Sequence, residues 1–335
     1  MHRLTATFQF ALPNELRVKR LPEDSLRYAA TVDGFEVTVD LLRNGGAKIM
    51  MSGERLEIRA ARELKVSVSR EENSAPPHIV GNGKGGRDVT ERRVWLEKLE
   101  PDYVAVALKV VNRVIRFFKY EMKTPHLREY EIRDAGFRNP VWIDEGGNRL
   151  APGVIRLSSR MLRPPGTELL GEKDFTAGED AKLSNVLQND ITVETHREFL
   201  SDAQNSILER KWKRAILEMA IACEVAVKQA FFAKASAAGA AFEYLEDKRR
   251  VSVRVIELMD GAAKLAFGSS FKDDDNSAYE QVDYLFRARN KVAHRGEMIY
   301  RDRNDVVQQV DRATLEKWWT SVAALMKWIG ERQTH

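Results

Sequence analysis

The chain has 335 residues, of which 43% are hydrophobic and 31% are charged, with six histidines and one cysteine, Cys223. A chain of this length is expected to form two domains or one large one with a sizeable core. The single cysteine excludes an intramolecular disulfide framework and zinc sites built from several thiolates, and it is typical of a reducing cytoplasm. The 54 basic and 50 acidic side chains leave a net charge of +4, too small to indicate a general polyanion binder.

The sequence also argues against a membrane protein. No apolar run reaches the roughly 18 residues that a membrane span needs. The first three residues lead into strand-like alternation and not into a signal sequence. We therefore expect a cytoplasmic protein that has no membrane partner.

The first half of the chain carries strand signals. Residues 5–10, 35–41 and 64–68 alternate apolar and polar side chains with a period of two, as strands with one buried face do. Residues 102–122 change to a helical period, and residues 142–143 with the turn at 145–148 indicate a strand and a hairpin. The expected fold class is α+β, with a mostly antiparallel sheet and one long helix.

Proline and glycine divide the chain. All ten prolines lie at or before Pro165, and 15 of the 20 glycines lie at or before Gly178. Because these residues mark turns and break helices, the shift indicates a strand-bearing part followed by an all-helical part. Residues 163–180 read as a connector. We predict an α+β domain over residues 1–190 and a helical bundle over residues 191–335.

About four helices are expected in the second part. The spacing of Ser201 and Gln204 predicts a capping box that opens a long helix running to Phe231. A second helical stretch covers residues 241–267, and residues 268–275 form a loop. Ser277 and Glu280 predict another capping box, for a helix that ends near Gly296. The final helix has an apolar stripe that contains Trp318 and Trp319.

The helix that ends near Gly296 holds the most informative residues. On a helical projection that takes Val282 as zero, Arg289 falls in the middle of the apolar face. A guanidinium keeps its charge and is costly to bury unpaired, so Arg289 must line a polar cleft, pair with a carboxylate, or face a partner or an anion. Asn290 and His294 are four residues apart and therefore share one flank of the helix. Residues 284–296 contain four Arg or Lys side chains, one His and no acid.

An arginine, an amide and a histidine in this arrangement can cleave RNA without a metal. The histidine would exchange protons with the 2′-hydroxyl or the leaving 5′-oxygen, and Arg289 would neutralise charge on the transition state. DNA lacks the 2′-hydroxyl nucleophile, so RNA is the expected partner.

Residues 289–294 resemble the Arg-polar-x-x-x-His motif of HEPN domains, with Asn at the polar position. The all-helical surroundings and a first helix with a mid-helix acid, Glu224, are similar to the C-terminal HEPN domains of bacterial defence and abortive-infection proteins. The resemblance covers about residues 195–335. It implies a four-to-five-helix bundle, a homodimer in which two motifs meet in one cleft, and metal-independent endoribonuclease activity without a cofactor. An antiviral or toxin role, with a protein or phage-derived trigger at the N-terminal domain, follows from the resemblance alone.

Carried over onto this sequence, the resemblance implies that Arg289, Asn290 and His294 are catalytic. Supporting or substrate-binding residues would be Arg287, Lys291, Arg295 and Glu224. Two alternatives stay open. The domain could be a non-catalytic HEPN module for dimerisation, nucleotide binding or scaffolding. Alternatively, Arg289 could form a structural ion pair with Glu224 or Glu218, and His294 could be an ordinary surface histidine.

Other features are weaker. Residues 81–86 contain the spacing of a phosphate-binding loop, but a surface loop is the simpler interpretation. Residues 273–275 are three aspartates that could recruit a cation, although a solvated loop explains them. The tandem tryptophans could stack on bases but fit the core better, and Cys223 lies on a buried stripe. The remaining histidines show no metal-ligand spacing, so we expect no metal site: His2, His78, His126, His196 and His335.

Overall fold

The structure is a computed structural model. It describes residues 1–17, 25–43, 47–51, 54–58, 60–78, 80–81, 87–137, 140–151, 175, 177–231, 244 and 254–333. The chain divides into two compact units, Met1–Thr192 and Val193–His335. Most of the connector lies outside the described residues, as do residues 241–243 and 245–253 of the stretch 241–267 and the tip of the glycine-rich loop at 82–86.

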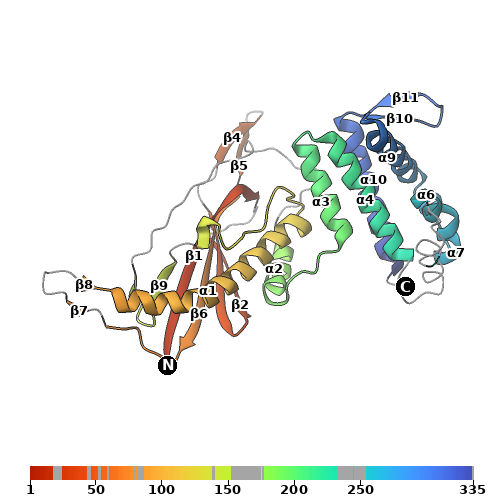
Figure 1. The fold of residues 1–335 in the computed structure, drawn as a ribbon. Helices are drawn as coiled ribbons and strands as arrows, with labels where there is room; N and C mark the ends of the chain where they lie inside the picture. The colour runs from red at the N-terminus through yellow and green to blue at the C-terminus, as the bar shows by residue number, and fades with distance from the viewer. Residues whose placement is uncertain are drawn as a thin grey trace. The chain divides into compact units, whose positions relative to one another are not determined.

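A five-stranded antiparallel sheet forms the centre of the first unit (Figure 1). Its spatial order is β2-β3-β6-β1-β9, and the bounds are β1 His2–Arg17, β2 Ser25–Val32, β3 Phe35–Arg43, β6 Ala60–Glu72 and β9 Val141–Asp144. All three alternating segments are strands, and the α+β fold class is confirmed. The alternating pattern predicted these strands correctly because one face of the sheet is buried. Phe8 and Val66, for example, pair across β1 and β6 with their side chains buried.

Within the described ranges, three short pairs of antiparallel strands, each strand two to five residues long, add to these elements. Two lie in the first unit: β4 Ala47–Met51 pairs with β5 Glu54–Ile58, and β7 Val80–Gly81 pairs with β8 Arg87–Asp88. After β9 the chain turns at residues 145–148, where Gly147 takes a φ of +78° and the backbone of Asn148 donates to Asp144 at 2.8 Å. The hairpin turn expected there is therefore present.

The long helix α1 runs over Thr90–Arg116 and continues as a π-helical turn, η1, over Phe117–Glu121. It begins before residue 102, where the sequence predicted its start, because Pro101 lies inside the helix instead of preceding it. The buried face of α1 packs on the sheet. Tyr103 lies at that interface, its ring edge-on to Phe35 and Trp142 and its hydroxyl 2.9 Å from the Oε1 of Glu72.

Helix α2, Ala177–Asn189, closes the first unit and is tied to α1 by a buried arginine. The Arg113 side chain is 7% exposed and donates to the backbone carbonyls of Leu187 and Gln188, the latter at 3.2 Å. Arg116 pairs with Asp190 and with Glu129 at 3.0 Å and 2.8 Å. The prediction of a connector over residues 163–180 is wrong at its C-terminal end, because residues 177–180 form the first turn of α2.

The second unit is mainly helical. Its elements are α3 Thr195–Leu208, α4 Trp212–Phe231, α6 Val255–Glu257, the π-helical turn η3 Leu258–Ala262, α7 Ala263–Phe267, α8 Phe271–Asp274, α9 Asn276–Arg295, β10 Ile299–Arg301, β11 Val307–Gln309 and α10 Arg312–Gln333. Helix α4 packs against α3, α9 and α10. The expectation of an all-helical part missed the β10–β11 hairpin.

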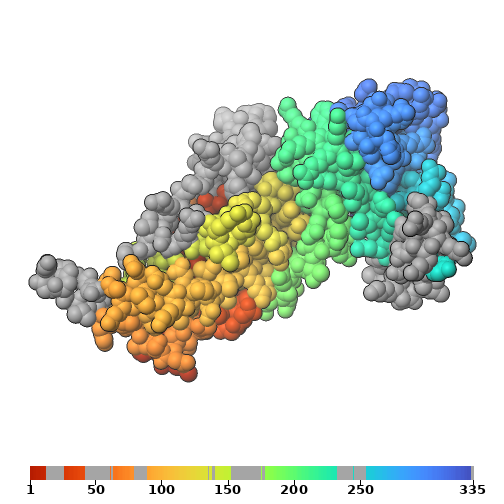
Figure 2. Space-filling view, in the orientation of Figure 1, coloured from red at the N-terminus to blue at the C-terminus, as the bar shows by residue number. Residues whose placement is uncertain are grey.

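The single long helix predicted from Ser201 to Phe231 is two helices. The chain turns at residues 209–211, where Arg210 takes a φ of +58°. Ser201 lies buried in the middle of α3, so it caps nothing, and the predicted capping box is wrong. Atoms of α3 and α4 belong to the green part of the surface in the space-filling view (Figure 2). A polar turn of three residues is enough to reverse a helix, and the apolar stripe continues on both sides of it.

Two other boundaries differ from the sequence prediction. Helix α9 is capped by Asp275, whose Oδ1 accepts from the backbone N–H of Ala278 at 2.9 Å, and not by Ser277. The predicted loop at 268–275 contains the short helix α8, capped by Ser270. The apolar stripe that the sequence predicted for the final helix is present on α10, where Trp318 is fully buried.

Candidate functional site

Helix α9 places all three predicted catalytic side chains in its last two turns. It ends at Arg295, and Gly296 follows with a φ of +69°, the left-handed conformation that glycine adopts at helix ends. The Gly296 N–H returns to the carbonyl of Val292 at 2.9 Å. The cap predicted from the sequence is therefore confirmed, and it sets where His294 leaves the helix.

Arg289 lies at the margin of the buried face of α9, not at its middle. It is half-buried, whereas Ala293, which the projection placed on the same face, is exposed. Leu285, Ala288 and Val292 are buried instead, so the core-facing side of the last turns is rotated away from Arg289. The projection was wrong here because it took Val282 as the centre of a face that shifts along the helix.

Arg289 and Asn290 are in contact. The Nη1 of Arg289 donates a hydrogen bond to the Oδ1 of Asn290 at 3.2 Å. This bond occupies the amide oxygen and leaves the amide N–H groups of Asn290 to donate elsewhere. The other N–H groups of the Arg289 guanidinium are likewise left to donate elsewhere. The pair therefore presents donors without an acceptor of its own.

Neither candidate acid pairs with Arg289. Glu218 accepts from the Ser206 hydroxyl and from the Nε of Arg214, both at 2.6 Å. Glu224 pairs with Lys228 on its own helix at 3.0 Å. Among the described residues no carboxylate forms an ion pair with Arg289, so the structural ion-pair alternative does not hold for either glutamate. Glu224, which the resemblance placed in a supporting role, pairs with Lys228 and not with Arg289 or Asn290.

The four cations around the motif differ in their surroundings. Arg287 pairs with Asp283 at 2.6 Å and donates to the carbonyl of Arg301 in the β10–β11 hairpin. It is thus engaged away from the motif. Lys291 and Arg295 form no ion pair with any described residue, and the exposed His294 likewise makes none. Arg289, Lys291 and Arg295 therefore keep their charges available, as a polyanion site needs.

A further cation near the motif was not found from the sequence. Lys213, in the first turn of α4, reaches the end of α9: a Cβ placed on Gly296 would lie 3.8 Å from its Nζ. It too forms no ion pair within the part of the chain that the structure describes. No sequence signal links residues 213 and 296, because only the packing of α4 against α9 brings them together.

The other sequence candidates have structural explanations. Of the three aspartates, Asp273 pairs with Lys264 at 3.0 Å, Asp274 accepts from Trp328 at 2.8 Å, and Asp275 caps α9. Within the described ranges, no three His, Cys, Asp or Glu side chains are grouped so that they could hold a metal ion. Cys223 is fully buried, and burial raises the pKa of its thiol far above the ordinary value, so it is no nucleophile.

No helix among the described residues combines the length and the apolar character that a membrane span requires. Comparisons of the chain with protein-family models, with curated proteins and with solved structures each found no match. The chemistry of the residues at the end of α9 therefore carries the functional argument by itself.

Proposed function

We propose that this protein is a metal-independent endoribonuclease of the HEPN type that acts in antiviral defence or as a toxin. One observation carries the proposal. Arg289, Asn290 and His294 lie in the last two turns of one helix, with donors left on the first two and with no acid among the described residues paired to any of them. Structural arginines elsewhere in the helical unit, such as Arg214 and Arg303, are paired with glutamates at 2.6 Å and 2.8 Å.

The proposed reaction is an internal transesterification. The 2′-oxygen of one nucleotide attacks the adjacent phosphorus and loses its proton to an imidazole. The bond from phosphorus to the 5′-oxygen breaks, and that oxygen takes a proton from an imidazolium. The products are a 2′,3′-cyclic phosphate and a 5′-hydroxyl. Arg289 and the amide N–H groups of Asn290 stabilise the extra negative charge that develops on the phosphate oxygens.

Two proton transfers on opposite sides of the phosphorus need two groups, whereas each motif supplies one imidazole. A homodimer that joins two α9 ends in one cleft would supply both. Light scattering should then give twice the 38.2 kDa mass of the chain. The N-terminal sheet unit would sense a protein or phage-derived trigger and set when the cleft is available.

A chimeric oligonucleotide tests the chemistry. We expect an all-deoxy strand that contains a single ribonucleotide to be cut once, on the 3′ side of that ribonucleotide, in the presence of EDTA. The same strand with a 2′-O-methyl group at that position should stay intact, because its nucleophile is blocked. Cleavage of the all-deoxy or 2′-O-methyl strand would contradict the mechanism. A dimer that leaves every RNA intact would favour the non-catalytic HEPN module.

A further inference from the structure

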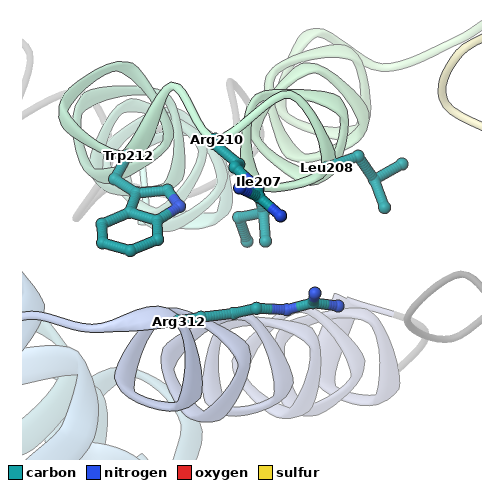
Figure 3. A pocket seen from close by; sticks show the side chains of 5 residues that line it. All are labelled: Ile207, Leu208, Arg210, Trp212 and Arg312. Atoms are coloured by element: carbon teal, nitrogen blue, oxygen red, sulfur yellow. The ribbon is translucent and has the colours of Figure 1, made fainter.

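A second polar site lies at the same end of the helical unit, apart from the motif. In Figure 1 the turn between α3 and α4 lies at the end of the unit where β10 and β11 are found. A pocket of about 430 Å³ opens there, within the size range of small-ligand sites. It is lined by Ile207, Leu208, Arg210, Trp212 and Arg312 (Figure 3).

The polar groups of this pocket are donors. The exposed Arg210 forms no ion pair with any described residue. Arg312 uses its Nε for Glu316 at 2.7 Å, which leaves both terminal nitrogens of its guanidinium without a partner among the described residues. The Nε1 of Trp212 is buried and has no acceptor among the described residues. None of the lining residues carries an acceptor side chain, so the pocket has the polarity of an anion site.

The geometry separates the polar from the apolar side. Figure 3 shows the Arg210 side chain crossing in front of Ile207, with the nitrogen on the Trp212 ring edge turned toward them and Arg312 across the opening on α10. Leu208 lies on the other side of Arg210 from the indole ring. A ligand that fits must combine an anionic group with a flat or apolar body. Two guanidinium forks match the several oxygens of a phosphate better than a single carboxylate.

The backbone at Arg210 supports a specific role for this side chain. Its φ of +58° is a conformation that glycine or asparagine adopts more readily than arginine. Backbone bonds close the turn, from the N–H of Arg210 to Ile207 and from that of Lys211 to Ser206, and the Glu209 side chain adds contacts with Asn205 and Lys211. The side chain of Arg210 is therefore not needed for the turn and remains available for a ligand.

We propose that this pocket binds a nucleoside monophosphate, with the phosphate held by Arg210 and Arg312, and the base against the Trp212 ring and the Ile207 and Leu208 side chains. The site shares no residue with Arg289, Asn290 and His294, so it does not rest on the proposed ribonuclease activity.

The test uses the full-length protein labelled with ¹⁵N at tryptophan and titrated with AMP, inorganic phosphate or adenosine. The Trp212 indole signal is assigned by its loss in Trp212→Phe. We expect AMP to shift this signal at lower concentration than phosphate does, and adenosine to bind more weakly than AMP. Arg210→Asn, which suits the left-handed backbone, and Arg312→Gln should each weaken AMP binding by at least about tenfold.

Lys317→Gln is the matched control. Lys317 is an exposed cation on the same helix as Arg312, it forms no ion pair with a described residue, and it lies outside the pocket. Its loss should leave AMP binding unchanged. No shift of the Trp212 signal at millimolar AMP would overturn the proposal, as would equal weakening by Lys317→Gln. AMP binding no tighter than that of phosphate would overturn the nucleotide assignment, and adenosine binding as tight as AMP would overturn the phosphate assignment.

Discussion

The Nη1 of Arg289 donates to the Oδ1 of Asn290 at 3.2 Å, although neighbouring positions on a helix point about 100° apart. The long arginine side chain bends around the helix to reach the amide. This contact engages the amide oxygen, so the amide N–H groups and the other guanidinium N–H groups are the donors that remain on the pair. In the proposed function, the pair is one donor surface for a phosphate, one helical turn before His294.

Asn290→Asp should abolish that surface without unfolding the helix. A carboxylate at this position would pair with Arg289 and repel phosphate, while position 290 is exposed and tolerates the change. Loss of a transition-state donor should lower RNA cleavage by at least about 100-fold. The measurement is the cleavage rate at saturating RNA, with circular dichroism to check the helix content.

Asn304→Asp serves as its control. It adds the same charge at an exposed asparagine in the turn between β10 and β11. A rate close to that of the wild type is expected for this variant. If both substitutions slowed cleavage equally, net charge and not the Arg289–Asn290 pair would be responsible.

Gly296→Ala should destabilise the protein by about 1 kcal/mol, because Gly296 has a φ of +69° that alanine adopts only with strain. Gly330→Ala, in the interior of α10 with nothing within 4 Å of an added Cβ, should instead stabilise it by about 0.5–1 kcal/mol. Urea denaturation measures both. Equal effects of the same sign would show that Gly296 does not hold the end of α9 as described.

Arg113→Met should destabilise the first unit by about 1.5–3 kcal/mol, the usual loss for hydrogen bonds made by a charged group. The methionine keeps most of the buried volume but leaves the carbonyls of Leu187 and Gln188 without their donor. Arg93→Met on the same helix removes only an exposed pair with Glu97 and should change stability by less than about 0.5 kcal/mol. Thermal or urea unfolding that ranks the two variants the other way would refute the role of Arg113.

His196 should make the helical unit less stable in mild acid. Burial lowers the pKa of its imidazole below the ordinary value of 6.5, and the opposing charge of Glu194 does not cancel this. Below pH 6.5 the unfolded chain therefore takes up a proton that the folded chain resists, so this contribution to stability falls as the pH drops. Comparing urea midpoints at pH 7.5 and 5.5, we expect the wild type to lose more stability than His196→Gln. A larger loss in the variant would reverse the assignment.

The sequence predicted those elements whose side-chain pattern is set by one buried face. The alternation around Phe8, Val39 and Val66 identified three central strands, and Gly296 identified the end of α9. The sequence pattern failed to predict features that depend on tertiary structure. The apolar stripe from Ile207 to Phe231 continues through a turn. Ser201 lies inside α3, which has no side-chain cap, and Asp275 caps α9 in place of Ser277.

For the candidate site, too, the sequence predicted the local features and missed those that depend on packing. Helical periodicity placed Arg289, Asn290 and His294 on one short segment, because their relation is local. It misjudged the orientation of Arg289, since the rotation of the buried face depends on what packs against it. The approach of Lys213 to Gly296, and the pocket that joins Arg210 to Arg312, are contacts between distant segments for which one sequence contains no signal.

The most direct test of the central claim is RNA cleavage in EDTA by the wild type, Arg289→Ala and His294→Ala, each purified in the same way. We expect the wild type to leave 2′,3′-cyclic phosphate ends, and each substitution to reduce the rate by at least about 100-fold. Wild-type cleavage that both variants retain in full would contradict the proposed function, because the activity would then come from residues other than these or from a contaminant.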